Sequence, residues 1–233
     1  MYPVPGIRST REDWKDCIAV FLRQRTSASI AKETGIGANR AVSMTHLLRA
    51  CMMADLPKRF KGPVEMDETY IGGQRKNKRL HIRKIKAKKG HGTDKLPIMG
   101  IFDRSGKQIY VEVMAQKLSM PHIFIIMSRQ VKAGAEVFTD GFKMYRGLKK
   151  KGFRHSYVDH DSGEYVRGEV HTNNIEGFWG ILKRKLSCIG GMRRGKLKFF
   201  VAEIVWRFNH RNISLTEQER KLLESVIKFG GRS

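Results

Sequence analysis

The sequence predicts an α/β protein in which a mixed β-sheet is flanked by helices and preceded by a small domain made only of helices. Helical periodicity dominates the first 55 residues, short β-rich runs follow from residue 64, and helical periodicity returns after residue 171. The chain has 233 residues, of which 40% are hydrophobic. This length suffices for one good-sized core and a small appended module.

The charge of the chain is its strongest compositional feature. It has 46 Lys and Arg against 22 Asp and Glu, a formal net charge of +24, which indicates a polyanionic partner. An anionic membrane surface would attract the same charge. However, the sequence has neither a strongly amphipathic basic helix nor an apolar run of the roughly 18 residues that a membrane span needs. We therefore expect nucleic acid as the partner, and no membrane.

The cysteines and the first residues bear on the compartment. Cys17, Cys51 and Cys188 lie far apart and form no CxxC pair, which favours a reducing environment and gives no zinc-binding spacing. The opening residues MYPVPGIRST have no apolar core of the kind that a signal peptide needs. We expect a cytoplasmic, nucleoid-associated protein.

Residues 1–55 are predicted to form a helical DNA-binding domain. Apolar residues recur at helical spacing over residues 11–24, and Ser27 is a candidate N-cap for the next helix. The spacing of Ala31 and Gly35 is that of a helix-turn-helix, in which glycine supplies the tight turn. A plain helical hairpin is the alternative, and the positive charge favours DNA binding. The second helix, over about residues 38–48, would present Asn39, Arg40, Ser43 and His46 to a DNA groove.

Residues 56–63, LPKRFKGP, read as a linker because prolines bracket basic residues. A second domain is predicted over residues 64–212, and a C-terminal helix over residues 213–233. The order of elements in the second domain predicts a mixed sheet with helices packed on it. The expected elements are a strand at 64–71, a hairpin at 96–114, a helix at 119–134, a strand from 135, a helical turn at 142–150, a strand at 153–160 and a helix at 171–186.

A basic run follows the first strand, with nine Lys or Arg among residues 75–89 and little apolar periodicity. A run of this kind is usually a solvated loop. On a chain this basic, we give equal weight to an arm that contacts the phosphate backbone. The candidate contacts in the run are Arg75, Lys76, Lys78 and Arg79.

Three carboxylates occupy places at which a fold of this kind would bring them together. Asp67 lies inside the strand 64–71, Asp140 stands where the strand from residue 135 stops, and Glu176 lies on the rim of the buried stripe of the helix 171–186. Close together and unpaired, these groups would repel one another, so the arrangement requires cations between them. Oxygen ligands select Mg²⁺ or Mn²⁺, and two such ions can support phosphoryl displacement.

Each of these residues also has an ordinary structural interpretation. Asp67 could be a solvent-facing acid on an edge strand, and Asp140 a turn residue, since Asp-Gly is a common turn pair. Lys183 lies seven residues after Glu176, nearly in register with it, and could be one more cation of the run KRKL.

Four blocks of sequence resemble a known family when they are taken in order. VEMDETYIGG, FTDGFKMYRGL, HTNNIEGFWGILKRKL and EIVWRFNHR are similar to the successive blocks of prokaryotic DDE insertion-sequence transposases, in the ISXO-like group related to the eukaryotic Merlin elements. The resemblance covers residues 64–211 and, weakly, the helix-turn-helix before them. Four blocks in the right order are far more specific than any one of them.

The resemblance implies an RNase H-like catalytic core with two Mg²⁺ or Mn²⁺ ions. Asp67, Asp140 and Glu176 would be the three metal-binding acids, and Lys183 the basic residue near the cut phosphate, followed by Arg184 as a further DNA contact. Strand alternation places Glu68 on the opposite side, outside the metal shell. Some members of the group carry Asn or His in place of the third acid, so the rival ligands to Glu176 are His171, Asn173 and Asn174.

The function that this resemblance implies is DNA transposition. We expect metal-dependent cleavage at transposon ends and strand transfer into target DNA, by a homodimer or higher assembly on double-stranded DNA. No cysteine pair is present for the N-terminal zinc ribbon that many relatives carry. The alternatives are an RNase H-like structure-selective nuclease, and a catalytically inactive DNA-binding regulator derived from a transposase.

Overall fold

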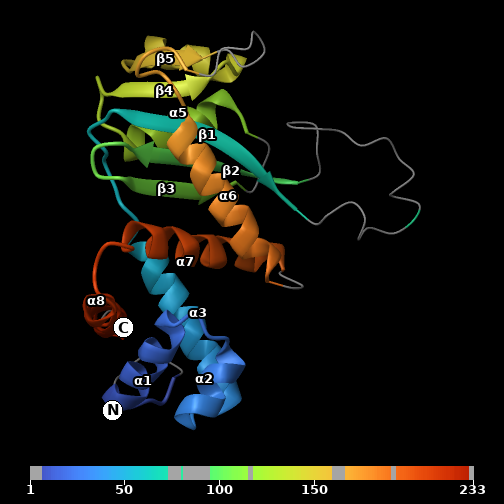
Figure 1. Cartoon of the computed structure of the whole chain (residues 1–233), viewed down its shortest axis with the longest axis vertical. Helices are drawn as coiled ribbons and strands as arrows, with labels where there is room; N and C mark the ends of the chain where they lie inside the picture. The colour runs from blue at the N-terminus through green and yellow to red at the C-terminus, as the bar shows by residue number, and fades with distance from the viewer. Residues whose placement is uncertain are drawn as a thin grey trace. The chain divides into compact units, whose positions relative to one another are not determined.

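The computed structural model describes residues 7–72, 80, 95–114, 118–158, 166–189 and 193–230. The chain divides into two compact units (Figure 1). The first unit combines Met1–Leu56 with Ala202–Ser233, and the second consists of Pro57–Val201. In the described residues, no helix is both long and apolar enough to cross a membrane.

The first unit is helical. It contains α1 (Arg11–Leu22), α2 (Ser27–Thr34), α3 (Ala38–Ala54), the later part of α7 (Leu197–Asn209) and α8 (Leu215–Gly230). The N-cap of α2 is Thr26, whose hydroxyl accepts a hydrogen bond of 3.1 Å from the backbone N–H of Ser29. The predicted cap, Ser27, is instead the first helical residue, because Thr26 already provides the oxygen that the exposed N–H groups need.

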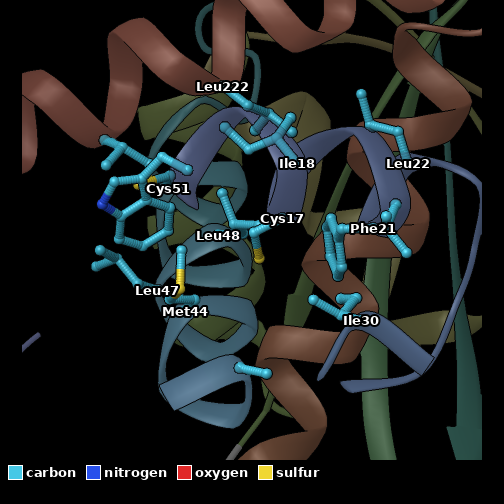
Figure 2. Packing of buried hydrophobic residues seen from close by; sticks show 14 of the residues in the cluster. Cys17, Ile18, Phe21, Leu22, Ile30, Met44, Leu47, Leu48, Cys51 and Leu222 are labelled. Carbon is cyan, nitrogen blue, oxygen red and sulfur yellow. The ribbon is translucent and has the colours of Figure 1, made fainter. Parts of the chain in front are cut away.

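One hydrophobic core holds these helices together, and Figure 2 shows much of it. Phe21 from α1, Met44 and Leu48 from α3, and Leu222 and Val226 from α8 are all almost fully buried in it. The C-terminal helix therefore belongs to the first unit, and the second unit ends at Val201. This division differs from the predicted domains 64–212 and 213–233. An apolar stripe in a sequence does not reveal which surface will cover it.

The predicted glycine turn lies between α2 and α3. Gly35 has φ of +71°, in the left-handed region that glycine adopts without steric cost, and its N–H donates to the carbonyl of Ala31 at 3.1 Å. The next helix starts at the predicted residue but runs on to Ala54.

The second unit contains a five-stranded sheet in the order β3-β2-β1-β4-β5. β1 pairs antiparallel with β2 and parallel with β4, β2 pairs antiparallel with β3, and β4 pairs parallel with β5. The predicted mixed α/β sheet is therefore confirmed, with β1 at its centre. The strands are β1 (Val64–Ile71), β2 (Leu96–Asp103), β3 (Gln108–Val113), β4 (Glu136–Asp140) and β5 (Arg154–Val158).

Helices cover both faces of this sheet (Figure 1). On one face, Met66 of β1 is buried with residues of α5 (Met120–Gln130) and of the 3-10 helix η3 (Lys143–Lys151). On the other, Glu65 and Asp67 bond to α6 (Asn173–Ser187). Because side chains alternate along a strand, β1 serves both layers. A second 3-10 helix, η5 (Arg194–Lys196), precedes α7.

Candidate active site

Asp67 lies at the middle of the central strand, facing α6. Its Oδ1 accepts the backbone N–H of Glu68 at 2.8 Å, and its Oδ2 accepts the indole N–H of Trp179 at 2.9 Å. Burial raises the pKa of Asp67 to about 8, and the charges of Glu68 and Asp140 add to the rise. Both hydrogen bonds lower the pKa, but they do not offset the burial. The carboxylate is thus oriented, partly desolvated and poorly compensated by charge.

Asp140 reaches the same region through the parallel pairing of β1 with β4. Val64 is opposite Val137, and three residues further along each strand come Asp67 and Asp140. The Oδ1 atom of Asp140 accepts the backbone N–H of Phe142 at 3.1 Å. Neighbouring parallel strands therefore bring the first two predicted acids together, and their repulsion is among the causes that raise the pKa of Asp67.

Glu68 points to the other face, as strand alternation predicts. The hydroxyl of the fully buried Tyr145 donates a hydrogen bond to its carboxylate. Burial raises the pKa of Glu68 to about 7, and the charge of Asp140 contributes to the rise. Glu68 therefore bonds to η3 on one face of the sheet, whereas Asp67 bonds to α6 on the other. The charge of Glu68 nevertheless contributes to the raised pKa of Asp67.

Glu176 stands in the first turn of α6 and is exposed. Its Oε1 accepts the hydroxyl of Thr172 at 2.6 Å. Among the described residues, no three His, Cys, Asp or Glu side chains are grouped so as to hold a metal ion. The structure thus brings Asp67 and Asp140 together and leaves Glu176 bonded to its own helix terminus.

The rival third ligands have different surroundings. Asn173 is exposed, whereas the amide of Asn174 donates to Glu65 Oε1 at 2.6 Å. His171 Nδ1 lies 3.4 Å from the same carboxylate oxygen. Two of the three alternative third ligands therefore contact Glu65. Glu176 is the candidate that carries a carboxylate, the group that a hard cation prefers.

The donor set around Asp67 fits a divalent cation. Carboxylate oxygens are the ligands that Mg²⁺ and Mn²⁺ prefer, and a cation would relieve the repulsion that raises the pKa of Asp67. Asp67 and Asp140 would hold it, with Glu176 as the remaining acid on the adjoining helix.

Glu65 is a site residue that the sequence analysis missed. It is completely buried on β1, two residues before Asp67 and on the same face. Its carboxylate accepts hydrogen bonds from Arg104 and from the start of α6. The sequence signal that would have pointed to Glu65 is a carboxylate in an otherwise apolar strand, two residues from Asp67 and therefore on the same strand face.

The predicted DNA contacts lie in three places. Lys183 and Arg184 are exposed on α6. On α3, Asn39 and Ser43 are exposed, and Arg40 and His46 are partly buried, with Arg40 donating to the carbonyl of Arg8 at 3.1 Å. The contacts predicted in the basic run, Arg75, Lys76, Lys78 and Arg79, lie outside the described residues.

Fold and site together define a class: an α/β domain with a mixed sheet and two aspartates on its adjacent strands β1 and β4. Residues 59–209 match the family model of the ISXO2-like transposase domain, which covers well over half of the chain. The chain belongs to this transposase family.

Two curated relatives agree with this assignment. An uncharacterized protein in transposable element ISH50 of Halobacterium salinarum is 29% identical over 190 residues, which cover 77% of this chain and 64% of that protein. The chain thus spans less than two thirds of that relative. An uncharacterized transposase-like protein of Haemophilus influenzae is 28% identical over 103 residues, which cover 44% of this chain and 80% of that protein.

Among solved structures, the simian T-cell lymphotropic virus intasome in complex with PP2A regulatory subunit B56 gamma gives a TM-score of 0.40 at 12% identity. The match covers 85% of this chain and 70% of that chain. The family assignment rests on the sequence matches and not on this similarity.

Proposed function

We propose that the chain is a DNA transposase that cleaves DNA at the ends of a mobile element and joins those ends to target DNA. The observation that carries the proposal is the position of Asp67 and Asp140, each three residues beyond the pair Val64 and Val137 on adjacent parallel strands. There the charge of Asp140 contributes to the raised pKa of Asp67, in a chain of the ISXO2-like transposase family. The alternative for Asp67, a solvent-facing acid on an edge strand, does not fit, because β1 is the central strand of the sheet. Asp140 does accept the N–H of Phe142 in the turn after β4, and its charge also acts on Asp67.

Mg²⁺ or Mn²⁺ is the proposed cofactor, as two ions held by Asp67, Asp140 and Glu176. When bound, such ions stabilise charge on the attacking and leaving oxygens of a phosphodiester. The chain's own groups orient the ligands: Trp179 and the N–H of Glu68 hold the Asp67 carboxylate, and the N–H of Phe142 holds that of Asp140. Preorganised ligands of this kind need little rearrangement when the cofactor binds.

Double-stranded DNA is the proposed substrate, as element ends and as target. The net charge of +24 supports a phosphate-rich partner, and the exposed Lys183 and Arg184 lie on the helix that carries Glu176. Because two element ends must be joined, the proposed acting species is a homodimer or a higher assembly on DNA.

The test is Mg²⁺-dependent cleavage of DNA that carries an element end. We expect Asp67→Asn and Asp140→Asn each to lower the cleavage rate about a thousandfold, equivalent to roughly 4 kcal/mol of lost transition-state stabilisation. Binding to the same DNA should stay strong and salt-sensitive in both variants. Asp16→Asn, which changes an exposed acid on α1, is the matched control and should cleave normally.

A second assay separates the rivals. A pre-cleaved end is incubated with target DNA, and joined products are measured. Cleavage without joining would indicate a structure-selective nuclease. Binding without any turnover, unchanged by Asp67→Asn, would indicate a DNA-binding regulator and would overturn the proposal.

A further inference from the structure

We propose that Glu65 is a positioning residue, which fixes the start of α6 to the central strand and thereby sets Glu176 relative to Asp67. This inference rests on the proposed function, because it concerns the placement of the third acid. It assigns a role to a buried carboxylate whose partners are Arg104 and the start of α6.

The side chain of the N-cap residue does not cap α6. The first N–H groups of a helix have no partner within it and need an external acceptor. Thr172 occupies the N-cap position, but its hydroxyl accepts no backbone N–H of the helix and donates to Glu176. Of the first N–H groups, that of Asn173 donates to His171 Nδ1 at 3.4 Å. The carboxylate of Glu65 takes over this role and accepts the N–H groups of Asn174 and Ile175, each at 3.0 Å. A carboxylate there also complements the positive end of the helix dipole.

The charge of Glu65 is compensated in its buried position. Arg104 Nε donates to Oε1 at 2.8 Å, and the side-chain amide of Asn174 donates to the same oxygen. Arg104 also donates to the carbonyls of Glu169 and His171, at 2.7 and 2.9 Å, in the segment that leads into α6. One buried ion pair therefore fastens both the helix start and the loop before it to β1.

Two hydrogen-bonded points attach α6 to β1, and Glu176 lies between them. Glu65 holds Ile175, and Asp67 holds Trp179 one helical turn later. Two attachments on one strand face determine both the height and the rotation of the helix over the sheet. Figure 1 shows α6 lying across the sheet.

An ordinary capping role would stabilise the fold without affecting metal binding, so the test needs a readout of the metal. The indole N–H of Trp179 bonds to Asp67, so Mn²⁺ held by Asp67 should broaden its NMR signal, and Trp179→Phe assigns that signal. In Glu65→Gln we expect about tenfold more Mn²⁺ to be needed to broaden the Trp179 indole signal by half. Changing a residue that holds metal ligands in place typically weakens metal binding by about this factor.

A double-mutant cycle then tests whether Glu65 acts through Glu176. If it does, Glu65→Gln combined with Glu176→Gln should bind Mn²⁺ no more weakly than Glu176→Gln alone. Met127→Ala is the stability control, because Met127 is buried on the opposite face of the same sheet. It should lower the melting temperature and leave the Mn²⁺ requirement unchanged.

If Glu65→Gln does not fold, Arg104→Lys replaces it, because lysine keeps the charge but loses the fork that binds both carbonyls. For Arg104→Lys we expect half-broadening to need more Mn²⁺ than in the wild type, by a smaller factor than in Glu65→Gln. Wild-type Mn²⁺ binding in the variant, or additive effects in the cycle, would overturn the inference alone. Unchanged Mn²⁺ binding and cleavage in Asp67→Asn would instead overturn the proposed function.

Discussion

The indole N–H of Trp179 donates a hydrogen bond of 2.9 Å to Oδ2 of Asp67, joining α6 to the central strand of the sheet. Trp179 is itself buried, so the bond forms in a partly dry environment where orientation is well defined. This contact gives the first prediction.

Trp179→Phe keeps an aromatic ring in place and removes only the donor. We expect cleavage to fall about ten- to a hundredfold, since a hydrogen bond to a charged group contributes roughly 1.5–3 kcal/mol. Trp206→Phe is the matched control, because the indole of Trp206 donates to Asp55 Oδ2 at 2.8 Å in the first unit. Equal cleavage rates in the two variants would contradict the role given to Trp179.

Gly100 makes room for the same indole ring. It is paired with Asp67 across β1 and β2, and a Cβ at residue 100 would lie 2.6 Å from Cη2 of Trp179. Gly100→Ala should therefore displace α6, lower the free energy of unfolding by about 1–3 kcal/mol and reduce cleavage. Denaturant unfolding and the cleavage assay measure the two effects.

Gly180→Ala is the control for this substitution. Gly180 lies on α6, and a Cβ there meets nothing within 4 Å. We expect a gain of about 0.5–1 kcal/mol from the better helix propensity of alanine. Equal destabilisation by the two glycine substitutions would refute the steric explanation.

His155 gives the protein a pH-dependent stability. It is buried on β5 beside Thr139, whose hydroxyl is 2.8 Å from Nε2, and burial together with the charge of Lys149 lowers its pKa to about 4. Between about pH 6.5 and pH 4 the unfolded chain binds a proton at His155 more readily than the folded chain does. The stability that neutral His155 contributes is therefore fully present above pH 6.5 and is lost as the pH falls.

We therefore expect the wild type to lose about 2 kcal/mol between pH 7 and pH 5 relative to His155→Gln. Urea unfolding at both pH values measures the difference. Parallel pH profiles for the two proteins would show that His155 is not the titrating group.

Arg207 should be important for the stability of the helical unit. Its guanidinium donates to the carbonyls of Phe21 and Leu22 at the end of α1, at 2.8 and 2.9 Å, and to Glu203 at 3.0 Å. Arg207→Met should cost about 2 kcal/mol, because the acceptors remain partly buried. Arg220→Gln, which breaks only exposed pairs with Glu217 and Glu224, should leave the melting temperature unchanged. A similar melting temperature for both variants would contradict this assignment.

DNA binding provides a prediction that separates the two kinds of contact. Asn39→Ala on α3 should reduce the preference for element-end DNA over random DNA, by about 1–3 kcal/mol for a base contact. Lys183→Gln should weaken binding to both DNAs alike. It should also make the dependence of the logarithm of the binding constant on the logarithm of the salt concentration less steep, by the amount that about one phosphate contact contributes. Competition binding at several salt concentrations measures both. Loss of binding at every sequence in Asn39→Ala would contradict the base-reading role.

The local features of this protein were readable from residue order. Strand periodicity and the position of Asp140 at a strand end are properties of a few consecutive residues, and the four family blocks supplied their common context. These features led to the mixed sheet and to the aspartate pair. The glycine turn at Gly35 was predictable for the same reason, since the required backbone angle is a local property.

Other features depend on which surfaces meet, and no run of residues encodes that by spacing. The burial of α8 against α1 and α3, the capping of α6 by Glu65, and the fit of Trp179 over Gly100 each join segments far apart in the chain. The order of residues settled where the acidic groups stand on their strands and helix. The tertiary structure settled how those elements are held against one another, because burial and hydrogen bonding are satisfied between elements and not within them.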